Sequence, residues 1–204
     1  MKEMCKIGFC FLLRELIISH NHFYHLFRHL YLNNNQLSGT ISPSIDNLNL
    51  AEQIYLGQNS FDGTIPSNIG STRPNNWRFF SLHANKLTGT IPENMKLKKL
   101  YQLDLSNNRL YGTIPEDIVH DNYSTLRLLY LNNNALDGTI PANLMQMRKL
   151  KAMYFNDNRK FSVLESYGEN ELYLDQMSAL ISPIIFNHIS YALCCHVHIS
   201  FFQG

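Results

Sequence analysis

Apolar and polar residues alternate in six short stretches of the chain, and this alternation predicts a series of short β-strands. In each stretch two apolar residues stand two positions apart, for example Leu30 with Leu32 and Leu129 with Leu131. Residues two apart in a strand point to the same face of a sheet, so each pair would face a core. Successive stretches start 23 to 26 residues apart, at Leu30, Ile54, Phe80, Leu103, Leu129 and Met153.

Each stretch continues with an asparagine, and the first five continue with a further apolar residue and a glycine. The full unit reads L-x-L-x-x-N-x-L-x-G-x-I-P, and four units end in Ile-Pro. An amide side chain carries two donated hydrogens and an accepting oxygen. Stacked asparagines can therefore satisfy backbone groups in the turns of adjoining units, where unpaired buried groups would be costly. We expect a structural ladder formed by Asn35, Asn59, Asn85, Asn108, Asn134 and Asn158.

The end of the unit predicts how the chain returns to the next strand. The glycine suits a tight bend, and the Ile-Pro pair stiffens the exit from it. The apolar residues that follow have helix-like spacing, as in Leu144, Met147 and Leu150, which places this segment on the outer side. One unit cannot bury its own apolar face, but stacked units share a core. The sequence therefore predicts an α/β solenoid of about six coils over residues 27–161, with a parallel β-sheet on the concave side and irregular or 3-10 segments on the convex side.

The repeated Gly-Thr-Ile-Pro pattern resembles the plant-type subclass of leucine-rich repeats, and it occurs at residues 63–66, 89–92, 112–115 and 138–141. Similar proteins include the ectodomains of receptor-like kinases and the polygalacturonase-inhibiting proteins, although no kinase motif is present in this chain. The resemblance implies a right-handed arc, a receptor-like or inhibitor-like role in protein or peptide recognition, and an extracellular or cell-surface location. Related extracellular proteins usually carry cysteine-bearing end caps, which the four cysteines here do not match. A cytoplasmic location is therefore the alternative.

The residues that alternate with the inward pairs would point out of the concave sheet, and we expect them to form the binding surface. One residue lies between the two inward apolar residues of each stretch, and in four of the six stretches it is a tyrosine. Tyrosine is enriched at protein interfaces. The alternative is that these tyrosines only pack against their neighbours on the strand surface. The candidate binding residues are Tyr31, Tyr55, Phe79, Ser81, His83, Asp104, Tyr130 and Tyr154.

The net charge and the sequence motifs argue against several other classes of function. The 17 basic and 16 acidic residues give a formal charge of +1, so bulk charge does not favour a nucleic-acid partner. The chain has no G-x-S-x-G motif and no phosphate-binding glycine loop, so we expect no enzyme and no cofactor. Clustered histidines, His20, His22, His25 and His29, match no zinc signature, and neither does the stretch 194–198. We expect no metal site, and a metal-dependent enzyme is the most distant alternative.

The two ends of the chain differ from the repeats. Residues 1–26 are expected to form an irregular segment, a weak signal or a cap, and residues 162–204 a C-terminal cap and hydrophobic tail. Residues 178–202 contain no Asp, Glu, Lys or Arg and are long enough to span a bilayer, although their proline and histidines would be costly there. Membrane association through this tail supports an alternative function, a structural or adhesive protein anchored at a membrane or cell wall. Asn122 begins the one glycosylation sequon.

Overall fold

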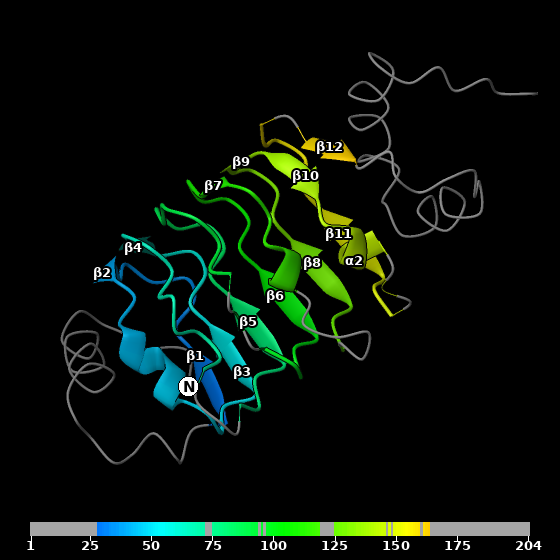
Figure 1. Ribbon diagram of the computed structural model, residues 1–204. Helices are drawn as coiled ribbons and strands as arrows, with labels where there is room; N and C mark the ends of the chain where they lie inside the picture. Colours follow the sequence, from blue (N-terminus) through cyan, green and yellow to red (C-terminus); the bar gives the residue numbers. More distant parts are fainter. Residues whose placement is uncertain are drawn as a thin grey trace, which may run out of the picture.

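The chain winds into a solenoid in which each coil contributes one strand to a continuous sheet, as the computed structural model shows (Figure 1). The structure describes residues 28–71, 75–93, 95, 97–118, 125–145, 147, 149–159 and 161–163. Neighbouring strands of the sheet are separated in sequence by one whole coil, and all of them run parallel. This arrangement confirms the predicted solenoid fold.

Six three-residue strands form the concave sheet in the order of the chain. They are β1 (His29–Tyr31), β3 (Gln53–Tyr55), β5 (Phe79–Ser81), β6 (Gln102–Asp104), β8 (Leu128–Tyr130) and β11 (Ala152–Tyr154). Six strands enclose about five complete turns, whereas the sequence predicts about six coils. The difference arises because a turn is complete only when the next strand closes it.

The middle residue of each strand points into the core, as the alternating pattern requires. Ile54, Phe80 and Leu129 are fully buried in this inner row. Leu30 is only partly buried and packs against the core cluster, because it belongs to the first described strand of the stack. Trp77 adds a fully buried side chain beside Phe80, and its indole Nε1 donates a hydrogen bond to the carbonyl of Leu48 at 2.7 Å.

The asparagines form hydrogen bonds from one coil to the next. The Nδ2 group of Asn85 donates to the carbonyls of Leu56 in the preceding coil and Leu82 in its own coil, at 3.1 and 3.0 Å. Its Oδ1 accepts from the backbone N–H of Phe61 at 2.9 Å. Asn85 therefore joins two coils through its amide group. Corresponding contacts to the preceding coil recur at Asn59, Asn108, Asn134 and Asn158.

Shorter pairs of strands come after the strands of the concave sheet in the chain, and they lie along another side of the coils (Figure 1). The glycines of the repeat lie here with positive φ, for example 81° at Gly89, which an L-residue adopts only with strain. An isolated parallel bridge joins Thr64 to Thr88. The pairs are β2 (Ser38–Thr40) with β4 (Ser60–Asp62), β7 (Tyr111–Gly112) with β9 (Ala135–Leu136), and β10 (Gly138–Ile140) with β12 (Phe161–Val163).

The convex side carries short helical segments of differing kind. They are the 3-10 helices η2 (Pro43–Asn47) and η3 (Glu116–Ile118) and the one-turn α-helix α2 (Ala142–Met145). Ser42 stands where other units have proline, and the structure gives this departure a role. Its side chain accepts a hydrogen bond from the N–H of Ser44 at 3.2 Å, so it caps η2 while Pro43 begins the helix.

Several sequence expectations lie outside the described residues. These are the N-terminal segment 1–26, the glycosylation sequon at Asn122, the histidines His20, His22 and His25, and the hydrophobic tail 178–202. Within the part of the chain that the structure describes, no helix is long and apolar enough to cross a membrane. The same residues contain no group of three or more His, Cys, Asp or Glu side chains placed to hold a metal ion.

Candidate functional site: the concave face

Parallel register brings the candidate residues of successive coils into one row across the sheet. Tyr31 pairs with Tyr55, and Tyr55 in turn pairs with Ser81. The row continues through Asp104 to Tyr130 and finally Tyr154. Phe79 starts β5 in the neighbouring row, and His83 follows the same strand. The structure therefore brings all eight candidate residues onto the concave side of one sheet.

The tyrosines of the row form two stacked pairs, one near each end. The rings of Tyr31 and Tyr55 have centroids 5.5 Å apart, and those of Tyr130 and Tyr154 lie 4.8 Å apart and almost parallel. Tyr31 is 58% exposed, and its hydroxyl donates a hydrogen bond to Oε1 of Gln53 in the next coil. Packing between neighbours and an outward-facing aromatic surface therefore occur together at these positions.

The inner tyrosine of each pair has a phenol that is harder to ionise than usual. Partial burial is the main cause that raises the pKa of Tyr55 above its ordinary value of 10.0, and the neighbouring Tyr31 and Asp104 add to it. The pKa of Tyr130 is raised for the same main reason, with Tyr154 and Asp104 as the further causes. Both hydroxyls therefore remain protonated at neutral pH and can donate hydrogen bonds to a ligand.

A compact polar network lies between the two tyrosine pairs. Nδ1 of His83 lies 2.8 Å from Oγ of Ser81 and 3.8 Å from Oδ2 of Asp104. The other oxygen of Asp104 accepts hydrogen bonds from both the N–H and the hydroxyl of Ser106, at 3.1 and 2.7 Å. The centre of the face is therefore polar and carries one carboxylate, whereas both ends are aromatic.

Ser81 differs from the sequence expectation. It is only 2% exposed, so it cannot serve as a direct contact for a ligand. The imidazole of His83 occupies the space beside it, because Gly57 in the preceding coil has no side chain: a Cβ on Gly57 would lie 2.1 Å from Nδ1 of His83. Ser81 therefore positions His83, and Gly57 is a residue of the site that the sequence pattern did not identify.

The same three residue types form the triad of serine hydrolases, but the geometry here is different. In a triad the histidine uses one ring nitrogen for the serine and the other for the carboxylate. In this site Ser81 and Asp104 both approach Nδ1 of His83. This arrangement does not create a relay from carboxylate to imidazole to hydroxyl, and it fits a positioned surface histidine better than a general base.

An aromatic contact extends the surface sideways from the polar centre. The ring of Phe79 lies 5.4 Å from that of Tyr101 in the next coil, at an interplanar angle of 39°. Tyr101 stands immediately before β6 and was not among the predicted contacts. The signal that could have identified it is its position one residue before a strand, directly after the buried Leu100.

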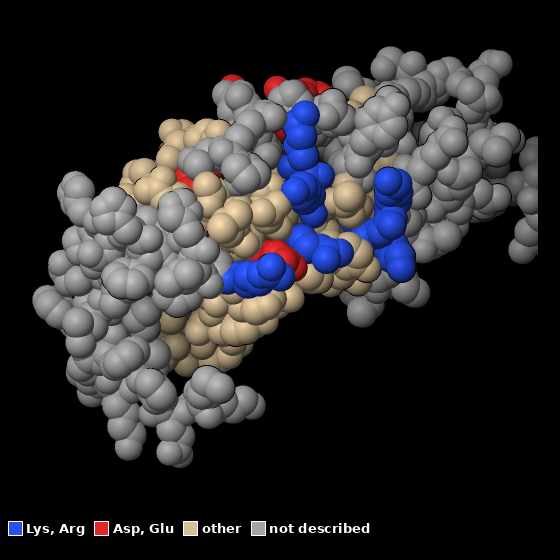
Figure 2. Space-filling model, turned by 90° about the horizontal axis from the view of Figure 1, so that it is seen from below, with Lys and Arg blue, Asp and Glu red and all other residues tan. Residues whose placement is uncertain are grey.

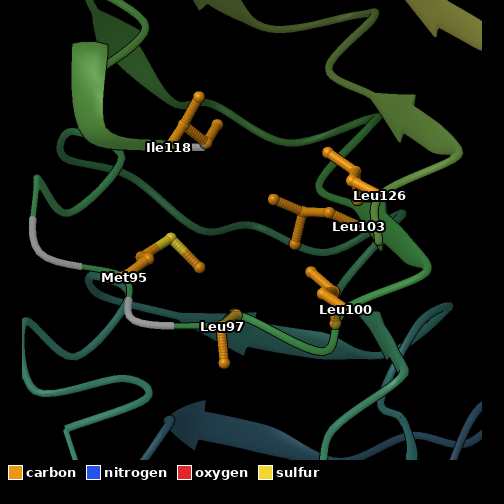
Figure 3. A pocket seen from close by; sticks show the side chains of 6 residues that line it. All are labelled: Met95, Leu97, Leu100, Leu103, Ile118 and Leu126. Carbon is orange, nitrogen blue, oxygen red and sulfur yellow. The ribbon is translucent and has the colours of Figure 1, made fainter. Parts of the chain in front are cut away.

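A hollow inside the solenoid is less suited to binding than the concave face. It lies beneath the convex segments and is lined by apolar side chains from two coils (Figure 3). Its accessible space of about 10 Å³ has room for about one water molecule, so the hollow is a packing feature of the core. Its lining residues are Met95, Leu97, Leu100, Leu103, Ile118 and Leu126.

Comparison with known proteins places the repeat in a family. The family model described as Leucine Rich Repeat matches residues 26–48, 99–120 and 125–147. No curated protein sequence matches the chain. Among solved structures, a chain of the BIR3–SERK2 complex from Arabidopsis thaliana is 34% identical with a TM-score of 0.58, over 65% of this chain and 68% of that one.

Two further structures show how far the likeness extends. The ectodomain of the receptor kinase SOBIR1 from Arabidopsis thaliana is 30% identical with a TM-score of 0.58, over 66% of this chain and 70% of that one. The plant peptide hormone receptor RGFR1, solved with RGF2, is 33% identical with a TM-score of 0.63, over 75% of this chain. The match spans only 23% of RGFR1 and 16% of the GASSHO1/SCHENGEN3 ectodomain. Repeat pattern, solenoid geometry and these identities agree, and the chain belongs to the leucine-rich-repeat family, in the plant-type subclass found in plant receptor-kinase ectodomains.

Proposed function

We propose that the protein is a non-catalytic recognition module that binds a protein or peptide across its concave face. The observation that carries this proposal is the row of side chains from Tyr31 to Tyr154, in which a polar centre lies between two aromatic pairs. Tyrosine provides a large rigid contact area and one hydrogen-bonding group at little entropic cost, which suits a binding surface.

The arrangement of the row fits an extended polypeptide that crosses the strands. Apolar or aromatic side chains of the ligand would pack on Tyr55 and Tyr130, and a donor or cation between them would meet the carboxylate of Asp104. Because the phenols of Tyr55 and Tyr130 stay protonated, each adds a hydrogen-bond donor for a backbone carbonyl. Solved relatives support this class of partner, since RGFR1 was determined with RGF2 and the HAESA ectodomain with the peptide hormone IDA.

The location follows the same proposal. The relatives are ectodomains of plant membrane receptors, so we place this module outside the cell or at its surface, in a receptor-like or inhibitor-like role. The anchored structural protein remains the alternative function, and its deciding segment, the tail 178–202, lies outside the described residues.

Selection from a displayed library of short peptides tests the proposal. Peptides enriched on the full chain should be lost when Tyr55 and Tyr130 are both replaced by alanine, with affinity falling at least about tenfold, because central aromatic contacts dominate interface energy. Tyr111→Ala is the matched control, since Tyr111 is 50% exposed but lies in β7, away from the concave sheet. Equal enrichment on the folded double variant and the wild type would contradict concave-face binding.

A further inference from the structure

Charged side chains are distributed unevenly around the solenoid. The described residues among the four before each concave strand form one long edge, which we call the strand-start edge. Figure 2 views the molecule from below relative to Figure 1 and shows basic side chains gathered on this edge around a single acidic one. Among the described residues, Glu52 is the acidic member, and the basic members are Arg28, Arg78, Lys98, Lys99, Arg127, Lys149 and Lys151.

The described acidic residues other than Glu52 lie elsewhere in the coils. They occupy the convex side, the concave centre and the far edge of the short strand pairs. Among the described residues, positive and negative charge are therefore separated in space, which the formal charge of +1 over the whole chain does not reveal. These acidic residues are Asp46, Asp62, Glu93, Asp104, Glu116, Asp117, Asp137 and Asp157.

A continuous backbone ladder holds the strand-start edge in place. The carbonyl of Arg28 accepts hydrogen bonds from the N–H groups of Glu52 and Gln53 in the next coil, at 2.7 and 3.2 Å. The carbonyl of Arg78 accepts in the same way from Tyr101 and Gln102. Each residue just before a strand is thus fixed one sheet spacing, about 4.8 Å, from its counterpart in the next coil.

Contacts with described neighbours orient three of the basic side chains on this edge. Arg28 lies 3.6 Å from the carboxylate of Glu52, yet its side chain is 76% exposed. The Nζ group of Lys99 donates to the neutral amide oxygen of Asn76 at 2.6 Å, and Nη1 of Arg127 donates to the carbonyl of Lys149 at 2.9 Å. These contacts orient the cationic groups but leave their charge available to a partner.

The order of charges along the edge points to one class of partner. Glu52 lies between Arg28 and Arg78 in successive coils, so a polymer with the same negative charge at every step would meet repulsion there. A polypeptide can instead place an acidic residue opposite each arginine and a basic or neutral residue opposite Glu52. Arginine also binds carboxylates through two parallel hydrogen bonds, which favours this pairing.

The spacing fits a helix in particular. Arg28, Arg78 and Arg127 precede β1, β5 and β8, which are alternate strands of the sheet and therefore about 10 Å apart. Two turns of an α-helix advance about 10.8 Å, so residues seven apart would face successive arginines. We infer that the strand-start edge, which adjoins the concave face at Tyr101, is a second binding surface, for an acidic helical segment of a protein partner.

A designed peptide tests this inference on the full chain. The probe is a labelled alanine-rich helix with glutamates seven residues apart and a lysine midway between the first two, where it would face Glu52. The control peptide has the same composition in scrambled order. Fluorescence anisotropy at physiological salt should show the matched peptide binding several-fold more tightly than the scrambled one. Addition of salt should weaken its binding, since the contacts are exposed ion pairs.

Charge reversals locate the surface. Arg78→Glu with Arg127→Glu should weaken the matched peptide about tenfold or more, because attraction is replaced by repulsion at two positions. Lys86→Glu with Arg109→Glu makes the same change of charge in exposed residues beyond the concave strands and should have little effect. Tyr55→Ala with Tyr130→Ala should also leave peptide binding unchanged, so this test is independent of the proposed concave-face function.

Glu52→Gln distinguishes a polypeptide from a uniform polyanion. The variant should bind the matched peptide equally or less tightly, because it loses the partner of the lysine. Tighter binding of an oligothymidylate than of the matched peptide would overturn the inference in favour of a nucleic-acid-like polyanion. Equal affinity for matched and scrambled peptides, no binding of either, or equal losses from the two charge reversals would overturn it as well.

Discussion

The γ-methyl group of Thr64 lies over the α-carbon of Gly89 in the next coil, 2.8 Å from the position that a Cβ atom on that glycine would occupy. The same relation joins Thr40 to Gly63 and Thr113 to Gly138. The Gly-Thr dipeptide of the repeat therefore contacts both neighbouring coils. Its glycine packs against the threonine methyl group of the preceding coil, and its own threonine methyl group packs against the glycine of the following coil.

Gly89→Ala should destabilise the protein by about 2–3 kcal/mol, because the new Cβ meets the methyl of Thr64 and φ is 81°. Thr64→Ser removes that methyl and keeps the hydroxyl. The Thr64→Ser, Gly89→Ala double variant should therefore recover part of the loss. Urea denaturation of the two single variants and the double variant forms the cycle, and strict additivity would show that the methyl contact does not determine the cost.

Asn85→Ala should lower the free energy of unfolding by about 2–4 kcal/mol, since it leaves backbone groups of two coils unsatisfied. Asn35→Ala should cost less, because the bonds described for Asn35 go to the carbonyls of Leu32 and Asn33 in its own coil. Denaturant midpoints measured on both variants check this order. Equal losses would contradict a ladder whose value comes from joining coils.

Gly57→Ala should displace the imidazole of His83 from its place beside Ser81 while the fold stays intact. The reason is steric, since the added methyl would overlap the ring. The histidine resonances in an NMR spectrum should shift in the variant, and affinity for peptides selected on the wild type should fall. Ser81→Ala removes the hydrogen bond without filling the space, so it should move the same resonances less. Unshifted resonances in Gly57→Ala would show that the ring does not depend on this gap.

Alkaline titration should show a late phase of tyrosine ionisation above pH 10.0, because the pKa values of Tyr55 and Tyr130 are raised, chiefly by burial. In the unfolded chain both phenols ionise near 10.0, so above that pH the native state binds more protons. Stability should therefore decline as pH rises through and beyond 10. Tyr55→Phe with Tyr130→Phe should remove the late phase of tyrosinate absorbance and flatten that decline. A late phase that persists in the double variant would assign it to other tyrosines.

The repeat pattern predicted those features that depend on one coil and its copies. Leu30 and Leu129 face inward because alternation fixes the direction of a strand residue, and equal spacing then sets the register that aligns Tyr31 with Tyr55. Features that arise between different residues of different coils were not predictable in this way. The burial of Ser81 depends on His83 filling the gap at Gly57, and neither residue belongs to the repeat consensus.

The distribution of charge over the surface was not predictable from the sequence for the same reason. Net charge sums over the whole chain, whereas the positions of Arg78 and Arg127 just before their strands become one edge only when the coils stack. The structure has about five complete turns where the sequence predicts about six coils. Met153 begins a sixth unit that supplies a strand and an asparagine, but a complete turn needs the strand of a following coil.

Stacking of the coils fixes the distances between side chains on different strands of the sheet as multiples of one strand spacing. Tyr55 and Tyr130 stand three strand spacings apart, about 14 Å, because β5 and β6 lie between their strands. That distance changes in steps of about 4.8 Å when a whole coil is gained or lost between the two tyrosines. A substitution within a coil changes the chemistry of one side chain and leaves the spacing between strands unchanged. A protein of this design can therefore adjust what it recognises and over what length by two independent kinds of change.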